Sequence, residues 1–380
     1  MTTTLRVVVD QLLAPVPGGI GRYAEGLTRE LVSTAPRGCE VVGVVAAHPR
    51  AERERLAELL PGLARVESTL LGRRELSLAW QAGAVGRSAR GMVHATSLLA
   101  PLVGHDRVNE PGTQTVVTIH DTVPWTHPET LTPRGVNWHR AMTRRAVRYA
   151  DAVVVPTHAV ADELAERYRF GDRLRVVGGA VSPGLALPDD ADAVADDLDL
   201  PERYVLSVGT LEPRKGLEPL VRAMAHPDAP EIPLLVVGPA GWGDVRVADL
   251  AERAGLPPER VRTLGFVSDA QLAVLQQRAS VFVFPSLAEG FGLPVVEAMH
   301  FGTPVIVSDA PALVEVAADA AVVVPRDDPE HYPERLAQAI FQVTADLELS
   351  TRLGIAGLDR VRAFSWRDSA DKVWQLHADI

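Results

Sequence analysis

Two glutamates eight positions apart, Glu289 and Glu297, enclose the stretch of this sequence best suited to binding a polar ligand. The apolar run at 281–286 contains β-branched and aromatic residues and predicts a buried strand that ends just before Glu289. Gly290 and Gly292 then allow a tight turn that brings backbone N–H groups to the surface. The pattern predicts a loop that can bind hydroxyls through a carboxylate and an anion through its amides.

A helix is expected to follow this turn directly. Pro294 suits the first turn of a helix, and the next apolar residues continue it. The amides of Gly292 and Leu293 would then lie at a helix N-terminus, whose partial positive charge favours a phosphate group. Phe291 belongs to the same turn, and Glu297, one turn into the helix, would reach polar atoms farther along the same ligand.

Adjacent cations follow an earlier strand-like run. The run at 203–209 ends at Gly209 and leads into a loop that carries Arg214 and Lys215. The chain has 36 arginines but only two lysines, the other being Lys372, so a lysine in this loop is not generic surface charge. An ammonium can lie among phosphate oxygens and a planar guanidinium can bind two of them, so the pair could neutralise a diphosphate.

These two segments together carry a family resemblance. Gly209-Thr-Leu-Glu-Pro-Arg-Lys-Gly216 and Pro285-Ser-Leu-Ala-Glu-Gly-Phe-Gly-Leu-Pro-Val-Val-Glu-Ala-Met299 closely resemble the motifs of glycosyltransferase family 4. Its members are retaining enzymes of the GT-B fold that use nucleotide-diphosphate sugars. The resemblance spans nearly the whole chain and is most specific in the C-terminal half. It implies that Arg214, Lys215 and Glu289 are catalytic and that Glu297 binds the ribose.

The N-terminal half offers a second loop. Pro17-Gly-Gly-Ile-Gly-Arg22 has three glycines before a helix-like run and could donate amides to the far side of a diphosphate. The alternative is a tight strand-to-helix turn without a ligand. The resemblance favours donor contact at Gly19 and acceptor contact at Arg22 and Tyr23. The glycine spacing does not match the dinucleotide-binding fingerprint.

A histidine and an aspartate close the strand expected at 114–120. A histidine at a strand end is often only a hydrogen-bonded edge residue, but the resemblance implies that His120 touches the donor sugar. Asp121 is expected to orient its neighbours on the acceptor side, together with Trp125. The stretch His120–Glu129 resembles bacterial mannosyltransferases, which favours GDP-mannose as the donor and leaves UDP and dTDP sugars open. Base contacts are expected from Gly265-Phe-Val267, mainly through backbone groups, and Gly209 is expected to contact the donor.

Strand-like and helix-like runs alternate in both halves, which predicts an α/β protein with two doubly wound, Rossmann-like domains facing an interdomain cleft. The expected strands are at 5–10, 40–47, 91–95, 114–120, 152–157 and 174–179, then at 203–209, 233–238, 261–266, 281–286, 304–309 and 320–325. Residues 1–183 would form the acceptor domain, 184–201 an exposed acidic linker and 202–362 the nucleotide-sugar domain. By the resemblance, 363–380 would be a helix crossing back to the first domain.

Charge is divided unevenly within the formal net value of −11. Residues 1–180 have a net charge of +4 and residues 181–380 one of −15. Part of the basic excess lies at 137–148 and part at 50–74. The simplest explanation of this basic excess is that the arginines lie on solvated helix faces in an arginine-rich protein. An anionic acceptor or a peripheral membrane contact through the N-terminal domain is the alternative.

Several classes of protein are disfavoured by the same sequence. The single cysteine, Cys39, forms no internal disulfide, and the first residues lack a signal-peptide pattern, so a cytoplasmic location is expected. No apolar stretch is long enough to cross a membrane. No nucleic-acid partner is expected. A bilobed solute-binding protein would need an export signal, whereas an epimerase or a non-catalytic nucleotide-sugar sensor on the same scaffold stays open.

Metal dependence is not expected. Asp190-Ala-Asp192 and Asp197-Leu-Asp199 match the Asp-x-Asp pattern that binds a divalent ion in another class of nucleotide-sugar enzymes, but both fall in the acidic linker, away from any strand end. Arg214, Lys215 and a helix N-terminus can stabilise the leaving group instead. The expected substrates are a nucleotide-sugar donor and a glycan, glycolipid or small-molecule acceptor, with no cofactor.

Overall fold

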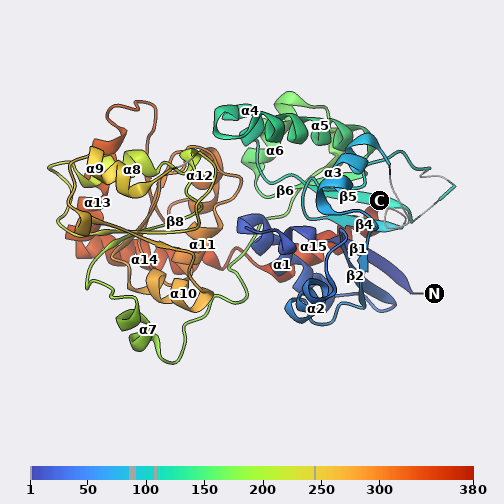
Figure 1. The fold of residues 1–380 in the computed structure, drawn as a ribbon, viewed down its shortest axis with the longest axis horizontal. Helices are drawn as coiled ribbons and strands as arrows, with labels where there is room; N and C mark the ends of the chain where they lie inside the picture. Colours follow the sequence, from blue (N-terminus) through green and yellow to red (C-terminus); the bar gives the residue numbers. More distant parts are fainter. Residues whose placement is uncertain (1, 85–90, 107–108, 111, 244) are drawn as a thin grey trace. The chain divides into compact units, whose positions relative to one another are not determined.

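The computed structural model describes residues 2–84, 91–106, 109–110, 112–243 and 245–380. The chain divides into two compact units (Figure 1). Unit 1 comprises Met1–Pro128, Thr132–Gly179 and Ser365–Ile380, and unit 2 comprises Glu129–Leu131 and Ala180–Phe364. Each unit is built around one parallel β-sheet with helices on both faces, so the chain has two Rossmann-like domains.

Unit 1 contains a seven-stranded parallel sheet in the order β3-β2-β1-β4-β5-β6-β7. Its inner strands are rich in valine and mostly buried, because helices cover both faces of the sheet. The strands are β1 Thr3–Val8, β2 Cys39–Val45, β3 Arg65–Ser68, β4 Met92–Ala95, β5 Gln114–Thr118, β6 Ala152–Val155 and β7 Leu174–Val176.

Helices α3, α5 and α6 pack on one face of this sheet, and Figure 1 shows α1 and α15 side by side on the other. Trp366 of α15 lies so close to Gly26 of α1 that a Cβ on Gly26 would be 2.3 Å from its ring. Trp374 donates its indole N–H to the Leu31 carbonyl at 3.2 Å. The helices are α1 Gly18–Ser33, α2 Arg50–Leu59, α3 Arg73–Ala82, α4 Val123–Thr126, α5 Pro133–Tyr149, α6 His158–Arg167 and α15 Trp366–Asp379.

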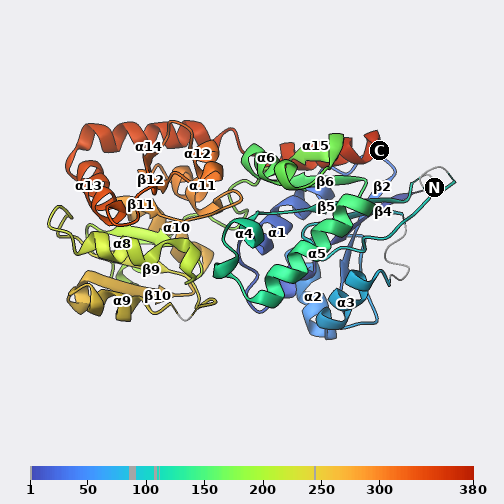
Figure 2. The same ribbon diagram turned by 90° about the horizontal axis from the view of Figure 1, so that it is seen from above.

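Unit 2 contains a six-stranded parallel sheet in the order β10-β9-β8-β11-β12-β13. Helices α8, α9 and α13 pack on one face, as Figure 2 shows from above. The strands are β8 Val205–Val208, β9 Leu234–Val237, β10 Val261–Gly265, β11 Val281–Phe284, β12 Val305–Ser308 and β13 Val322–Val324. The helices are α7 Ala191–Asp197, α8 Leu217–Met224, α9 Val247–Arg253, α10 Asp269–Arg278, α11 Leu293–His300, α12 Pro311–Ala317, α13 Tyr332–Ala345 and α14 Leu347–Val361.

In each sheet the order of the strands along the chain reverses at one point. The chain builds strands outward from β1 to β3, then returns to place β4 beside β1, and it repeats this from β8 to β10 before β11 joins β8. Loops that leave the carboxyl ends of two such neighbouring strands diverge and leave room for a ligand. The loops after β8 and β11 are the two motif segments, so the topology joins them at one edge.

All twelve expected strands form, but one further strand, β3, was missed. Its sequence, Arg-Val-Glu-Ser, was interpreted as part of a charged surface segment. β3 is one of the two edge strands of this sheet, and none of its residues is fully buried. An edge strand is less enclosed by neighbours than an inner strand and can carry charged side chains. The sequence of β3 therefore lacks the apolar run by which the inner strands are recognised.

The segment expected to be an exposed acidic linker contains a short helix, and its aspartates are exposed. Residues 191–197 form helix α7, and Ala195 is buried against unit 2. Arg278 bonds Asp192, and Arg262 donates to the Leu198 carbonyl at 3.0 Å. Asp192 and Asp199 thus pair with arginines at the surface, and the main segment of unit 2 begins at Ala180.

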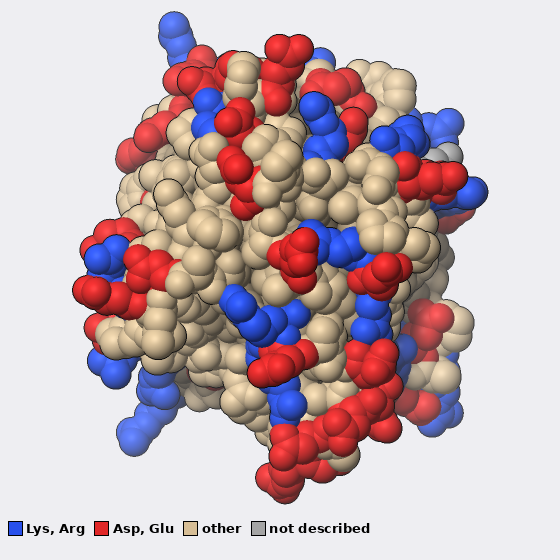
Figure 3. All heavy atoms as spheres, turned by 90° about the vertical axis from the view of Figure 1, so that its left-hand side faces the viewer, with Lys and Arg blue, Asp and Glu red and all other residues tan. Residues whose placement is uncertain are grey.

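Charged side chains of both signs cover the side of the molecule that carries unit 2, with a run of acidic groups along the lower edge of the view (Figure 3). This agrees with the acidic balance of residues 181–380. Among the described residues, no helix has the length and apolar character needed to cross a bilayer.

Candidate active site

Three charged side chains expected to be catalytic meet in unit 2. Lys215 Nζ lies 2.5 Å from Glu289 Oε1, and Arg214 reaches the same oxygen at 3.5 Å. Arg214 also bonds Glu212 at 3.0 Å. Each of the three side chains is at most 19% exposed. Two cations and two carboxylates thus form a nearly buried, charge-balanced group at the edge where β8 and β11 end.

Glycines hold the cationic loop in place. Gly216 has a φ of 67°, and a Cβ there would lie 2.1 Å from the Pro285 carbonyl oxygen. Gly238, after β9, has a φ of 148°, and its Cβ would lie 1.9 Å from the Gly209 carbonyl oxygen. A larger residue at either position would be strained and would collide with backbone, so the loops after β8, β9 and β11 pack in direct backbone contact.

Burial and neighbouring charges shift the pKa values of Glu289 and Lys215. Burial alone would raise the pKa of Glu289, but Lys215 and Arg214 outweigh it and hold that pKa below its ordinary value. Burial, with the nearby Arg214 charge, lowers the pKa of Lys215, while Glu289 opposes this shift. An anionic ligand that reaches Lys215 and Arg214 would compensate the desolvation of both cations.

The loop after β11 turns into α11 as expected. Gly292 is the N-cap of α11, with a φ of 92°, and Pro294 lies in the first turn. Phe291 is buried and packs edge-on against Phe364 at 5.4 Å. The amides at the start of α11 therefore follow Glu289 within four residues, at the positive end of the helix dipole.

Glu297 and the residues expected to contact the base have different environments. Glu297 is 1% exposed and accepts a hydrogen bond from Ser182 Oγ at 2.7 Å. Phe266 is 83% exposed after β10, whereas Val267 is buried. The ribose contact of Glu297 and the base contacts of Phe266 and Val267 stay predictions.

Trp242 was missed by the sequence interpretation. Trp242 follows β9 and is 41% exposed. β9 is the neighbour of β10, the strand that precedes Phe266. Gly243 has a φ of 96° and packs against Pro213, which ties this turn to the cationic loop. The signal that could have found it is a tryptophan between two glycines directly after a predicted strand.

In unit 1, His120 lies beyond the end of β5. Its Nε2 donates to the Thr96 carbonyl at 2.7 Å, which leaves Nδ1 as the acceptor of a neutral ring. Burial lowers the pKa of His120, while the Thr96 bond and the nearby Asp121 oppose the shift. His120 is therefore held neutral, with one nitrogen fixed by the end of the neighbouring strand.

Residues expected on the acceptor side support the fold of unit 1. Tyr23 is only 3% exposed and packs edge-on against His120 at 4.8 Å, so it positions that ring, and its acceptor contact stays a prediction. Trp125 donates its indole N–H to Tyr168 Oη at 3.1 Å, and Asp121 accepts from the Val123 amide. Gly19 is exposed in the first turn of α1, and Arg22 is half-buried.

A buried network that the sequence interpretation missed holds the glycine-containing loop. Asp10, at the end of β1, is buried and accepts hydrogen bonds from the Ala46 amide at 2.7 Å and from Arg73. Arg73 also donates to Gln11 Oε1 at 2.6 Å, and Gln11 donates to the Pro17 carbonyl at 3.0 Å. Arg73 and Asp10 are 63 positions apart, and sequence spacing does not indicate that they meet.

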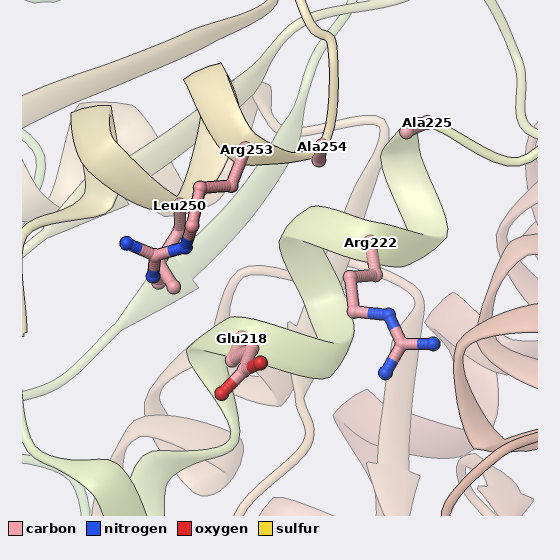
Figure 4. Close-up of a pocket in the computed structure, with 6 residues that line it drawn as sticks. All are labelled: Glu218, Arg222, Ala225, Leu250, Arg253 and Ala254. Atoms are coloured by element: carbon pink, nitrogen blue, oxygen red, sulfur yellow. The ribbon is translucent and has the colours of Figure 1, made fainter.

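A hollow of about 270 Å³ lies elsewhere on unit 2, between α8 and α9 (Figure 4). Arg222 of α8 and Arg253 of α9 line it together with Glu218. It contains none of the residues expected in the site.

The two Asp-x-Asp sequences lie in and around α7, where Asp192 is paired with Arg278. Within the described part of the chain, a different group, His226, Asp228 and Glu334, brings three potential metal ligands within 4.8 Å of one another. Exposed groups of this kind are common without an ion, and independence from metal stays a prediction.

Sequence models of two families match the chain and together span both units. The model described as Glycosyltransferase Family 4 matches residues 17–184, and the model described as Glycosyl transferases group 1 matches residues 190–357.

Individual proteins show similarity at lower coverage. O-antigen chain mannosyltransferase B of Escherichia coli is 36% identical over 168 residues, which are 43% of this chain and 43% of that protein. Alpha-maltose-1-phosphate synthase of Mycolicibacterium smegmatis is 28% identical over 312 residues, 77% of this chain and 80% of that protein. The chain thus matches less than half the length of the first of these relatives.

A solved structure shares the fold over its full length. Anabaena HepE in complex with UDP-glucose has a TM-score of 0.75 and 18% identity, and the match covers 100% of each chain. At this identity the similarity establishes the architecture alone.

Proposed function

The chain belongs to glycosyltransferase family 4 and has the GT-B fold, and on that premise we propose that it transfers a hexose from a nucleotide-diphosphate sugar to a hydroxyl group with retention at the anomeric carbon. The observation that carries this proposal is the convergence of Arg214, Lys215 and Glu289 beside the start of α11. Two cations and helix amides fit a diphosphate, and the carboxylate fits sugar hydroxyls.

In the proposed reaction, the bond between the anomeric carbon and the donor phosphate oxygen breaks, and its electron pair goes to the diphosphate. Arg214, Lys215 and the amides of Gly292 and Leu293 stabilise the charge that develops there. The acceptor oxygen bonds to the anomeric carbon on the same face, and its proton passes to the departing phosphate. Glu289 positions the sugar through its hydroxyls, and His120 of unit 1 is proposed to contact the donor sugar.

The proposed donor is GDP-mannose. A mannosyltransferase among the relatives supports mannose as the transferred sugar. A UDP or dTDP sugar is the alternative, and the UDP-glucose complex of a protein with the same fold supports it. The proposed acceptor is a hydroxyl of a glycan, a glycolipid or a small molecule, and a cytoplasmic location stays a prediction.

The first test measures the binding of GDP, UDP, ADP and dTDP by calorimetry, in the presence of EDTA. Preferential binding of GDP is expected. Lys215→Ala should weaken binding roughly tenfold to a hundredfold, because a charge-assisted hydrogen bond contributes about 1.5–3 kcal/mol. Lys372→Ala, which removes the other lysine from an exposed site on α15, should leave the affinity unchanged.

Equal or absent binding of the four nucleotides would remove the basis of the donor site. Turnover then separates a transferase from a sensor or an epimerase: only a transferase forms a new glycosidic bond when GDP-mannose is supplied with candidate acceptors.

A further inference from the structure

The backbone between Pro285 and Glu289 is held along its whole length. Tyr332 Oη donates to the Pro285 carbonyl at 3.3 Å, and Ser308 Oγ donates to the Ser286 carbonyl at 2.5 Å. Arg326 donates to the Leu287 carbonyl, and Arg214 reaches the Ala288 carbonyl at 3.5 Å. Four consecutive carbonyls before Glu289 thus accept hydrogen bonds from side chains.

Arg326 is the charged member of this group that lies outside the two sequence motifs. It follows β13, where the Arg326 Nε donates to Asp309 Oδ1 at 2.5 Å, and Asp309 follows the neighbouring strand β12. The Asp309 amide bonds the Val324 carbonyl at 3.2 Å, so both ends of this ion pair are tied to the sheet. The Arg326 guanidinium joins the ends of β12 and β13 to the turn after β11.

The Leu287 residue links this bridge to the cationic loop. Its carbonyl accepts from Arg326, and its amide donates to the Arg214 carbonyl at 2.7 Å. A shift of Leu287 would therefore move Glu289, two residues later, relative to Lys215. Contacts to a carboxylate that must lie within hydrogen-bond distance of a reacting sugar tolerate little displacement.

We propose that Arg326, anchored by Asp309, is a positioning residue that holds the loop 285–289 and thereby sets Glu289 against Lys215 and the donor sugar. This inference rests on the proposed function for its catalytic consequence, whereas its structural part concerns only the contact between Glu289 and Lys215. Arg326 itself acts through the Leu287 backbone.

The test uses the fact that the chain has only two lysines. Lysine labelled with ¹³C at Cε gives one signal for Lys215 and one for Lys372, and each is followed by NMR as a function of pH. In Arg326→Ala, a displaced Glu289 no longer supports the charged form of Lys215, so the pKa of Lys215 should fall. Simple removal of a positive charge would act in the opposite direction. Lys372, exposed on α15, is the internal reference.

Turnover of GDP-mannose is measured in parallel. Arg326→Ala should lower kcat roughly tenfold to a hundredfold and change GDP affinity much less, because the bridge positions the sugar-binding carboxylate. Arg326→Lys, which keeps a cation near Asp309, should restore part of kcat. Arg335→Ala is the matched control: this nearby arginine, similarly exposed, bonds Asp327 and the Asp328 carbonyl instead.

An unchanged or raised pKa of Lys215 in Arg326→Ala, or an unchanged kcat, would overturn the inference. If that variant does not fold, Asp309→Asn weakens the anchor while keeping the arginine, and the same two readouts decide. Failure of all nucleotide binding in the unmodified protein would instead contradict the proposed function, and the Lys215 titration would still report on the bridge.

Discussion

Glu289 has two roles that a single substitution can separate: it partners Lys215, and it is proposed to bind the sugar. Glu289→Gln keeps the shape and removes the charge, so turnover should fall on the order of a hundredfold. GDP binding should not weaken, because Lys215 and Arg214 lose the carboxylate that competes with a diphosphate. Calorimetry and initial rates measure the two effects, and Glu212→Gln is the matched control. Equal losses of GDP affinity and of turnover would contradict this division of roles.

Helix α15 packs on the rest of unit 1 next to a buried histidine pair. The rings of His377 on α15 and His94 on β4 lie 5.7 Å apart, and neither nitrogen of His94 has a partner among the described residues. Burial lowers the pKa of His377 to about 4, and burial with the nearby His377 lowers the pKa of His94 well below its ordinary value. Protonation therefore opposes docking.

Because both folded-state pKa values are depressed, the unfolded chain binds more protons than the folded one. The stability is fully present above the ordinary histidine pKa of about 6.5 and is lost as the pH falls toward 4. For His377, a change from pH 7 to pH 5 should cost about 2 kcal/mol, seen as a lower Tm with a red shift of tryptophan fluorescence. His377→Gln should reduce this pH dependence, whereas His300→Gln, on an exposed site, should not. A pH-independent Tm would contradict the account.

For the whole molecule, the uneven charge leads to a proposal about its surroundings. Helix α5 contains five arginines and no acidic residue, and Arg134, Arg144 and Arg148 are exposed on one face of it. We propose that this face contacts anionic membrane lipids peripherally. Sedimentation with vesicles containing phosphatidylserine should show binding that weakens with salt, since each basic side chain near such a surface contributes about 1 kcal/mol.

Replacing the three α5 arginines by glutamine should lower vesicle binding at least tenfold. The matched variant changes three exposed arginines of unit 2, Arg222, Arg246 and Arg253, and should bind as the unmodified protein does. Equal losses in both triple variants would indicate nonspecific attraction, and absence of binding would remove the membrane proposal.

The sequence by itself determined the fold class, the inner strands and the motif residues of unit 2. Apolar runs with β-branched residues identify strands buried on both faces, and glycine, proline and cation spacing identifies the loops after β8 and β11. These signals are local, so one chain suffices to read them. Edge strand β3 and helix α7 contain charged residues where the inner elements contain apolar ones. Their sequences therefore lack the apolar pattern from which a strand or a helix is predicted.

Only the tertiary structure decided which residues meet. The pairing of β8 with β11 brings Lys215 to Glu289 across 74 positions, and the same long-range assembly places Arg326 on Leu287 and Arg73 on Asp10. It also buries Tyr23, because α15 packs against α1 and places Trp366 beside the Tyr23 ring. Sequence spacing records no such contacts, since they depend on strand order and on which helix covers which face of a sheet.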